Sequence, residues 1–259
     1  MAELTTFKIG GPIDLLAEPA TVSELERVLD FCAAHKLPWM IIGAGSNLLV
    51  RDKGIRGAGI KLAGEFTEWA VNGTTVEAGA GVLLADLAKA VSERGLSGLE
   101  FACGIPGTVG GGVYMNAGAY GGEIADVVGK VQAVKKGKGT VWFAKDELRL
   151  GYRFSRFQTE SDMVITKAEF NVRPDSVELT RARVDEFTRA RAGKQPLEMP
   201  SAGSVFRRPE GYYVGPLIEA AGLKGFSIGG AQVSPKHAGF IVNTGSATAR
   251  DVLSLIAHI

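Results

Sequence analysis

The feature that most restricts how this chain can fold is a glycine-rich stretch from Glu100 to Glu123, EFACGIPGTVGGGVYMNAGAYGGE. It holds eight glycines in 24 residues, although glycine weakens helices and strands because it loses the most backbone freedom on folding. A mobile loop is the alternative, but flexible linkers are polar, and these glycines alternate with apolar Phe101, Ile105 and Val109. The stretch predicts backbone that passes close to a bulky partner or presents N–H groups to an anion.

Composition narrows the class of protein. The chain has 259 residues, 46% of them apolar, which is enough for a sizeable core. Its net charge of +1 indicates no nucleic-acid or membrane partner, and no apolar run has the length of a membrane span. Cys32 and Cys103 show no pairing pattern and predict free thiols in the cytoplasm. The three histidines lack metal-ligand spacing, so no metal is expected.

The first 62 residues predict a strand, a helix, a strand and a glycine turn. Thr21 and Glu24 form a capping box that starts the helix, and the strand at residues 39–42 runs into the turn Gly43–Leu48. A dinucleotide-binding fingerprint is excluded, because its third glycine and following helix are missing and residues 48–50 favour a strand. The turn predicts a phosphate site made of backbone N–H groups, with the Ser46 hydroxyl and Asn47 amide beside them.

The middle of the chain favours strands. We expect strands at residues 75–81, 127–134, 140–143 and 163–172, a charged hairpin turn at 135–139, and a helix from Leu84 to Gly95. A short strand is also expected at residues 5–11.

The last part differs in composition and begins after Pro174. It predicts a charged helix over 179–191, a strand at 204–206, a helix over 216–222, a strand at 238–243 and a helix from Thr248. The four arginines of the charged helix predict a solvated face more than a binding patch. The final helix shows no end signal before Ile259, so we expect further chain beyond it.

No local motif identifies the chemistry by itself. The run of residues 107–112 lacks the Lys-Ser/Thr of a phosphate-binding P-loop. Arg153 lies among aromatic residues and Ser204 lies between a turn and a strand. An ion pair for Arg153 and a backbone-capping hydroxyl for Ser204 remain the ordinary alternatives to a catalytic role.

Taken together, however, nine segments in order resemble the UDP-N-acetylenolpyruvoylglucosamine reductases. They are TTFKIGG, IIGAGSNLLVRDKG, GLEFACGIPGTVGG, MNAGAYGGEI, GYRFSRF, KQPLEMPSAGSVF, LIEAAGLKG, IGGAQVSPKHAGFIVN and ATARDVLSL. The resemblance implies an α+β fold with a two-part FAD-binding domain of the vanillyl-alcohol-oxidase/PCMH type and a smaller α+β substrate-binding domain. The corresponding domains would be residues 1–62, 63–173 and 174–259. The length and the short link after Phe157 resemble the shorter type of the family, which lacks an added tyrosine-bearing loop.

The resemblance also implies an activity. Such enzymes hold FAD non-covalently, take electrons from NADPH, and reduce UDP-N-acetylglucosamine enolpyruvate to UDP-N-acetylmuramate for peptidoglycan, on which cell shape and division depend. Two other functions stay open from the residues. One is a flavin oxidase of the same superfamily, in which Cys103 could tether the flavin, and the other is a non-catalytic flavin-binding protein.

Site residues follow by matching positions. Arg153 matches the cation that stabilises negative charge, and Ser204 matches the proton donor to carbon. Tyr120 and Lys194 match substrate-holding positions, and Arg208 stands where the family usually has an asparagine beside the substrate. The positions implied for FAD are Gly43, Ala44, Gly45, Ser46, Asn47, Leu48, Gly104, Ile105, Pro106, Gly107, Thr108, Gly110, Gly111, Asn116, Ala117, Gly118 and Ile124.

Two departures from the family pattern affect these expectations. Arg208 replaces an amide with a charge, so the substrate contacts there differ from the family's. The family's third catalytic residue is a glutamate in a segment after the last helix, and no residue before Ile259 matches it. Glu123 and Glu219 have motif context but do not stand at that position.

Overall fold

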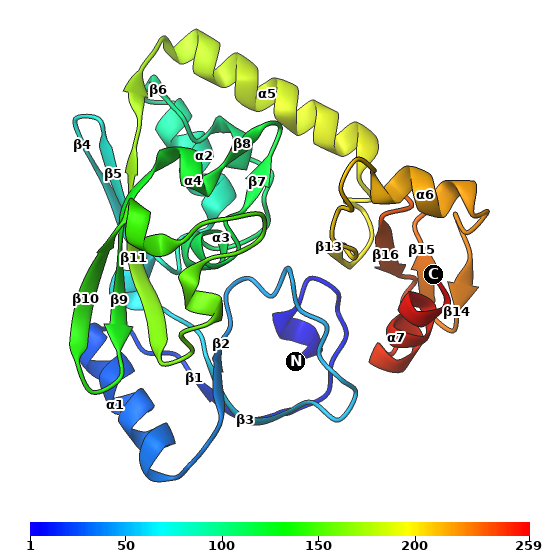
Figure 1. Cartoon of the computed structure of the whole chain (residues 1–259), viewed down its shortest axis with the longest axis horizontal. Helices are drawn as coiled ribbons and strands as arrows, with labels where there is room; N and C mark the ends of the chain where they lie inside the picture. Colours follow the sequence, from blue (N-terminus) through cyan, green and yellow to red (C-terminus); the bar gives the residue numbers. More distant parts are fainter. The chain divides into compact units, whose positions relative to one another are not determined.

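The computed structural model describes residues 1–259, and the chain divides into two units (Figure 1). The larger unit contains residues 15–43 and 58–189, and the smaller unit contains residues 1–14, 44–57 and 190–259. Both combine helices with sheets, as an α+β fold requires. The unit limits differ from the expected boundaries at 62 and 173, and the division into three functional domains stays a prediction.

A five-stranded antiparallel sheet forms the centre of the larger unit, in the order β10-β9-β11-β5-β4. Its strands are β4 (Trp69–Asn72), β5 (Thr75–Gly79), β9 (Val128–Lys135), β10 (Gly139–Ala144) and β11 (Met163–Asn171). In the middle strand, Phe170 lies opposite Val76 on one side and Val128 on the other, and all three are buried. The predicted strands and the predicted hairpin are present, and their buried apolar residues pair across neighbouring strands to form the core of the sheet.

Helices α1 (Val22–Ala34) and α2 (Leu84–Ser92) add their apolar faces to this core. The Thr21 hydroxyl accepts the Glu24 N–H at 3.2 Å, so the predicted cap starts α1. Strand β1 (Ile13–Ala17) precedes α1, and β2 (Trp39–Ile41) follows it and runs parallel to β3 (Ile55–Ile60). The three strands make a separate sheet in the order β1-β3-β2.

The glycine-rich stretch contains a helix that the sequence pattern did not indicate. Helix α3 (Val109–Tyr114) begins after Thr108, whose hydroxyl accepts the Gly111 N–H at 3.3 Å. Figure 1 shows α2 and α3 on one side of the five-stranded sheet. The short elements of this unit are η2 (Gly64–Thr67), β6 (Leu96–Ser97), η3 (Glu100–Ala102), β7 (Gly118–Ala119), β8 (Gly122–Glu123), α4 (Ile124–Val127), η4 (Lys145–Leu148), η5 (Arg156–Gln158) and β12 (Arg173–Pro174).

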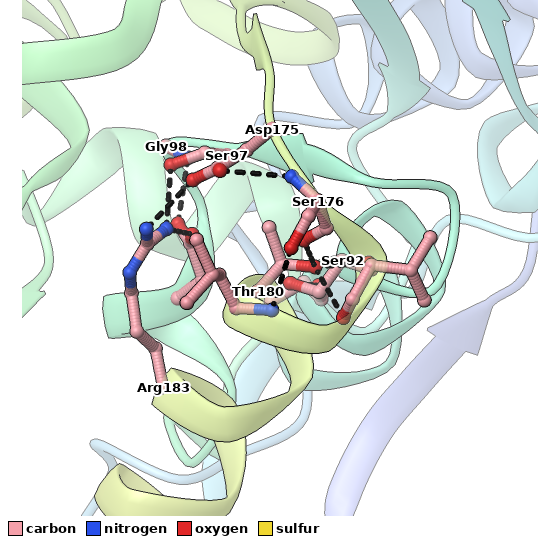
Figure 2. Close-up of polar contacts among 11 residues, drawn as sticks. Ser92, Ser97, Gly98, Asp175, Ser176, Thr180 and Arg183 are labelled. Carbon is pink, nitrogen blue, oxygen red and sulfur yellow. Dashed lines mark hydrogen bonds and ion pairs between the residues drawn. The ribbon is translucent and has the colours of Figure 1, made fainter.

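Arg183 of helix α5 (Val177–Lys194) bonds this helix to neighbouring segments of the larger unit (Figure 2). Arg183 donates from Nη1 to Glu100 Oε1 at 2.7 Å and from Nη2 to Asp175 Oδ2 at 2.6 Å. In the same turn, the Thr180 hydroxyl donates to the Ser92 carbonyl at 2.6 Å. The expected solvated face of α5 is therefore wrong for Arg183, whose carboxylate partners come from other segments.

These contacts lower the pKa values of the Glu100 and Asp175 carboxyl groups. Burial raises the pKa of Glu100, but the Gly98 N–H and the Arg183 guanidinium outweigh it and hold that pKa below its ordinary value. The hydrogen bond from Arg183 likewise lowers the pKa of Asp175. A carboxyl whose folded-state pKa is lowered stabilises the fold above its unfolded-state pKa, and the contribution is lost as the pH falls through the folded-state pKa.

We therefore expect Glu100→Gln to destabilise the protein in a pH-dependent way. At pH 7 the free energy of unfolding should fall by roughly 1–2 kcal/mol, because Gln keeps the shape but loses charge-assisted bonds. The difference from the wild type should shrink as the pH falls through the lowered pKa of Glu100, because the wild-type carboxyl then also becomes neutral. Urea unfolding at pH 7 and pH 3 measures this. Asp162→Asn, at a partly exposed 3.6 Å pair with Lys135, is the control and should change stability by less than about 0.5 kcal/mol. A constant difference at both pH values would contradict the argument.

The smaller unit has a four-stranded sheet in the order β13-β16-β15-β14. Its elements are η1 (Ala2–Leu4), β13 (Ser201–Ser204), α6 (Val214–Ala220), β14 (Ser227–Ile228), β15 (Ala231–Val233), β16 (Phe240–Asn243) and α7 (Ala249–His258). Helix α6 begins two residues before Pro216, earlier than expected. None of the helices in either unit combines the length and apolarity needed to cross a membrane.

Segments far apart in sequence build the core of this unit. Phe7 and Ile9 are buried against the sheet and helix α7, but residues 5–11 do not form the predicted strand. The Asn243 amide donates to the Phe7 carbonyl at 3.1 Å, and the Asp52 carboxylate accepts the Ala249 N–H at 2.7 Å. Hydrogen bonds thus join the N-terminal segment and residues 44–57 to the C-terminal part of the chain.

Candidate functional site

The turn Gly43–Leu48 is irregular backbone, and neither a helix nor the expected strand at residues 48–50 follows it. Gly45 has φ +64°, and a Cβ atom there would overlap the Leu4 carbonyl oxygen, so only glycine fits. The N–H groups of Ala44, Ser46 and Asn47 donate no hydrogen bond within the protein. Successive free N–H groups in a turn form a concave site for an anion such as a diphosphate.

Helix α3 provides the second glycine surface. A Cβ atom at Gly43 would lie 2.7 Å from the Thr108 hydroxyl, so Gly43 lies against the residue that precedes α3. At exposed Gly111, an added Cβ would meet only Thr108 Oγ1, at 3.5 Å. The protein itself therefore does not require glycine at 111, although glycine weakens a helix. A flat ligand such as FAD lying against α3 explains the glycine, so these residues fit the cofactor that the sequence predicts.

We therefore expect Gly111→Val to weaken FAD binding without destabilising the apoprotein. The free energy of unfolding of the apoprotein should not fall, because an added Cβ meets only Thr108 Oγ1, at the ordinary contact distance of 3.5 Å, and valine has a higher helix propensity than glycine. FAD should bind at least about tenfold more weakly, a loss of ~1.4 kcal/mol. FAD titration followed by flavin fluorescence and thermal unfolding of the apoprotein give the two values.

Gly112 supplies a matched control one residue along the same helix. It is buried, and a Cβ there would lie 2.9 Å from Leu84 Cδ2. Gly112→Val should therefore destabilise the apoprotein itself, by about 1–3 kcal/mol through overpacking. Normal FAD affinity in Gly111→Val would contradict the prediction that the flavin requires glycine at position 111.

The predicted cation Arg153 lies beside the loop that follows α3. Its Nη1 donates to the Asn116 carbonyl at 3.3 Å and its Nη2 to the Gly118 carbonyl at 2.9 Å. Its guanidinium also lies 5.3 Å from the centre of the Tyr152 ring. Arg153 forms no ion pair with a carboxylate and is half-buried. The ion-pair alternative is therefore wrong, and the positive charge is held in place without being neutralised.

Backbone strain gathers at the predicted site. Asn116, Tyr120 and Arg153 have φ values of 40°, 53° and 53°, in the left-handed region that non-glycine residues rarely adopt. Each such residue costs on the order of 1–3 kcal/mol and persists only where the surroundings impose it, often at functional sites. Three of the chain's six non-glycine residues with positive φ thus fall on positions that the resemblance singles out.

Tyr120 forms part of a groove in the larger unit. Its ring stacks on Phe187 with centres 4.6 Å apart and planes 6° from parallel. The groove has a volume of about 690 Å³, and its other walls include Glu100, Arg173 and Arg183. Tyr120 is exposed over 40% of its surface, so it can contact a ligand there.

The smaller unit holds Ser204 at the end of strand β13. Ser201 pairs with Val242 and Ser204 with Phe240, so β13 has one extra residue, a β-bulge. Gly203, with φ +79°, supplies the conformation that the bulge needs. Bulges redirect side chains and occur beside active sites. The Ser204 hydroxyl is exposed and makes one long bond, 3.4 Å to the Gly239 carbonyl, so it remains available to a substrate.

His237 is a neighbour of this serine that the sequence analysis did not assign. Its Nδ1 accepts the Gly239 N–H at 3.1 Å. A Cβ atom at Gly239 would lie 3.0 Å from the His237 ring and 3.2 Å from Ser204 Oγ, so this glycine separates the two side chains. The only signal in the sequence was the segment SPKHAGF, since a single histidine has no spacing to interpret.

The other predicted substrate residues are also in the smaller unit. Lys194 is the last residue of α5 and is exposed. Arg208 is exposed too, with its guanidinium 4.0 Å from the centre of the Tyr213 ring and its Nε donating to the Tyr212 carbonyl at 3.3 Å. Each offers a cation at the surface, as binding of a diphosphate requires.

The remaining positions predicted for FAD follow the loop into α3 and the segment after it. Residues 104–107 connect η3 to α3, and the Gly107 carbonyl accepts the Leu84 N–H at 2.9 Å. Gly110 packs against Ala80. Ile124 is completely buried in the core, so its side chain is not accessible to a ligand, and its N–H donates to the Ala117 carbonyl at 3.0 Å. Of the positions predicted for FAD, residues 116 and 118 also contact Arg153, because their carbonyl groups accept hydrogen bonds from its guanidinium.

Comparisons with known proteins agree with this geometry. The model of the "FAD binding domain" matches residues 13–144, and that of the "UDP-N-acetylenolpyruvoylglucosamine reductase, C-terminal domain" matches residues 195–259. A reductase of that name from Syntrophomonas wolfei is 50% identical over the whole chain, which covers 86% of the relative.

Solved structures give the same result. The UDP-N-acetylenolpyruvylglucosamine reductase of Thermus caldophilus is 39% identical, with a TM-score of 0.88 over 99% of this chain and 91% of that one. A solvent-stable cholesterol oxidase, 16% identical with a TM-score of 0.52 over 66% of this chain and 36% of its own, shares the fold alone. The predicted fold class, with an FAD-binding domain of the vanillyl-alcohol-oxidase/PCMH type, is confirmed. The chain belongs to the UDP-N-acetylenolpyruvoylglucosamine reductase family.

Proposed function

We propose that this chain reduces UDP-N-acetylglucosamine enolpyruvate to UDP-N-acetylmuramate, with FAD as bound cofactor and NADPH as reductant, in peptidoglycan synthesis. Family membership supports the activity. The observation that carries it is Arg153, a cation without a carboxylate partner, fixed by carbonyl groups beside the glycine surface of α3. A reaction that builds negative charge next to a substrate carboxylate needs such a cation.

FAD would supply hydride transfer, first accepting a hydride from NADPH and then delivering one to the substrate. The free N–H groups of Ala44, Ser46 and Asn47 would hold its diphosphate, and exposed Gly111 would let the ring system approach helix α3. The carbonyl groups of residues 116 and 118 accept hydrogen bonds from Arg153, so they would hold this cation near the flavin ring system.

Arg153 and Ser204 would divide the chemistry on the substrate. Once a hydride has reached the outer carbon of the enol double bond, negative charge develops on the carbon next to the carboxylate. Arg153 would stabilise this charge, and Ser204 would donate its hydroxyl proton to that carbon, which completes the addition of two hydrogens. A serine is a weak acid, so it needs a fixed position to act. We propose Tyr120, Lys194 and Arg208 as the residues that hold the sugar and diphosphate.

The proposal is tested by adding the two reactants in turn without oxygen. NADPH should abolish the flavin absorbance, and UDP-N-acetylglucosamine enolpyruvate should restore it and yield UDP-N-acetylmuramate by mass spectrometry. Absorbance that is lost with NADPH but never restored by this substrate would contradict the reductase and favour a non-catalytic flavin-binding protein. Restoration by oxygen with formation of peroxide, and none by the sugar nucleotide, would favour an oxidase.

A covalent flavin link through Cys103 has no support in the geometry. This side chain is buried, and its Sγ lies 3.7 Å from the Val184 carbonyl and 3.8 Å from the Thr188 hydroxyl, toward helix α5. Release of all FAD on denaturation is therefore expected. The cytoplasm as compartment, and a role in cell shape and division, remain predictions that go with the proposed pathway.

A further inference from the structure

We propose that the side chain of Asn116 positions Arg153, and that this amide acts on the reaction through Arg153 and not by binding the cofactor. The inference rests on the proposed function, in which Arg153 stabilises negative charge on the substrate. It also gives the Asn116 side chain a different role from the FAD contact that the resemblance implies. The backbone of residues 116–118 can still border the flavin.

Both ends of the Asn116 amide are hydrogen-bonded to other backbone segments. Its Nδ2 donates to the Gly151 carbonyl at 3.0 Å, and its Oδ1 accepts the Ala125 N–H at 2.9 Å. The residue is 0% exposed, so no face of the side chain is open to a ligand. A buried amide with both ends bonded fixes the segments that it joins, because breaking either bond would leave a buried polar group unpaired.

One of those segments is the turn that carries Arg153. Gly151 and Phe154 exchange two backbone hydrogen bonds of 3.1 and 3.0 Å, which makes a tight turn with Arg153 inside it. Asn116 holds the start of this turn through the Gly151 carbonyl, and its own carbonyl accepts from the Arg153 guanidinium at 3.3 Å. The backbone and the charged end of Arg153 are thus both anchored to one residue.

The conformations at both positions need such support. Asn116 and Arg153 each have left-handed backbone, with φ values of 40° and 53°, and such strain persists only where surrounding bonds impose it. The Gln158 amide adds to these bonds, because it donates to the Arg153 carbonyl at 3.0 Å and to the Tyr114 carbonyl at 2.9 Å. The Ser155 hydroxyl also donates to the Tyr114 carbonyl, at 2.8 Å.

A neutral amide at position 116 is chemically suited to positioning Arg153. A carboxylate at position 116 would be a charged group close to the Arg153 guanidinium and would neutralise part of its charge. A neutral amide holds the same turn by hydrogen bonds and leaves the full positive charge for the substrate. Asparagine also adopts left-handed backbone more readily than most residues, which fits its φ of 40°.

The test uses Asn116→Gly in the FAD-loaded protein, because glycine accepts the backbone conformation and removes only the amide. Loss of flavin absorbance with NADPH should keep its wild-type rate, and FAD content should be unchanged. The step with UDP-N-acetylglucosamine enolpyruvate should slow on the order of 10²-fold, since a displacement of about 1 Å has this effect. The fall should appear in kcat with little change in KM, as for an interaction made only in the transition state.

A double-mutant cycle separates positioning from a general structural effect. In an Arg153→Gln background, Asn116→Gly should slow the substrate step by less than about twofold more, because residues that act as a unit are not additive. Full additivity would overturn the proposal, and so would an unchanged substrate step in Asn116→Gly. Phenylglyoxal modification of Arg153, mapped by mass spectrometry, should be faster in Asn116→Gly, since the guanidinium is then less restrained.

Two further variants keep the test valid if Asn116→Gly folds poorly. Gln158→Leu removes another support of the turn and should slow the same step several-fold, with normal FAD content. Thr159→Val is the matched control, because its hydroxyl bonds only to the Arg156 carbonyl, at 2.9 Å, and its rates should equal those of the wild type. A wild-type protein that does not act on the sugar nucleotide would contradict the proposed function, whereas phenylglyoxal labelling would still test the positioning.

Discussion

Replacing Ser204 by alanine should slow the substrate step by about 10²–10⁴-fold, the range of a positioned proton donor. The hydroxyl is exposed, and its one internal bond, to the Gly239 carbonyl, is 3.4 Å long and therefore weak. Its removal should change the free energy of unfolding by no more than about 0.5 kcal/mol. Stopped-flow measurement of the two steps, with NADPH and with the sugar nucleotide, separates chemistry from folding. The NADPH step should stay near the wild-type rate.

Ser201→Ala is the matched control for this variant. It lies at the other end of β13 and pairs with Val242, and its carbonyl, which remains in the variant, accepts from the Thr6 hydroxyl at 2.6 Å. Both of its rates should equal those of the wild type. Equal slowing of the two steps in Ser204→Ala would show that the serine serves the cofactor or the fold and that proton donation has been assigned to the wrong residue.

The elements predicted correctly are those whose signals are local. The strands β9 and β10 of the hairpin are rich in β-branched and aromatic residues, which favour strands, and glycines at 137 and 139 take the positive φ values of its turn. Helix α1 carries its own N-cap at Thr21, whose hydroxyl accepts the Glu24 N–H, although the Glu24 carboxylate accepts from Ala20 and so does not complete the predicted capping box. In each case a few neighbouring residues determine the conformation, so no knowledge of distant contacts is needed.

Helix α3 could not be predicted in this way. Three consecutive glycines give it a poor intrinsic helix propensity, by about 1 kcal/mol each relative to alanine. It forms because tertiary contacts complete it. The Val109 N–H donates to the Val82 carbonyl at 2.8 Å, and the Gly110 N–H to the Ala80 carbonyl at 2.9 Å. These partners lie 27 and 30 positions away and leave no local pattern in the sequence.

Long-range pairing also explains why Arg183 departs from the solvated face expected of α5, on which Arg181 and Arg189 are exposed. Its four arginines look alike in the sequence, but only Arg183 meets Glu100, a residue 83 positions away, and Asp175, just before the helix. The predicted strand at residues 5–11 failed for a related reason. Phe7 and Ile9 are buried because the C-terminal part of the chain covers them, and they have no strand partner.

The site was predicted by resemblance, and the structure adds reasons that the residues alone did not contain. Strained backbone at Asn116, Tyr120 and Arg153 cannot be read from residue types. Neither can the bulge that redirects Ser204, although Gly203 beside it was a partial signal. The joint action of Arg153 and Ser204 on one substrate remains a prediction for kinetics.

Replacing Arg153 by glutamine should produce the other large effect, a substrate step slower by about 10³-fold, because one preorganised group that stabilises developing charge contributes on this scale. Glutamine keeps a donor but loses the charge. Arg153→Lys should recover no more than about tenfold, since a lysine is a point charge and cannot donate to the Asn116 and Gly118 carbonyls from a planar fork. Binding of FAD and the rate with NADPH should change little.

Arg149 offers a control with the same backbone strain and the same side chain. Its φ is 49°, and its guanidinium is exposed and paired with Glu160 at 2.9 Å. Because that charge is neutralised at the surface, Arg149→Gln should leave both steps unchanged and alter the free energy of unfolding by less than about 1 kcal/mol. A similar rate loss in Arg149→Gln and Arg153→Gln would mean that net charge or local folding controls the rate. A loss confined to Arg153→Gln would assign the effect to the guanidinium that the Asn116 and Gly118 carbonyl groups hold without neutralising it.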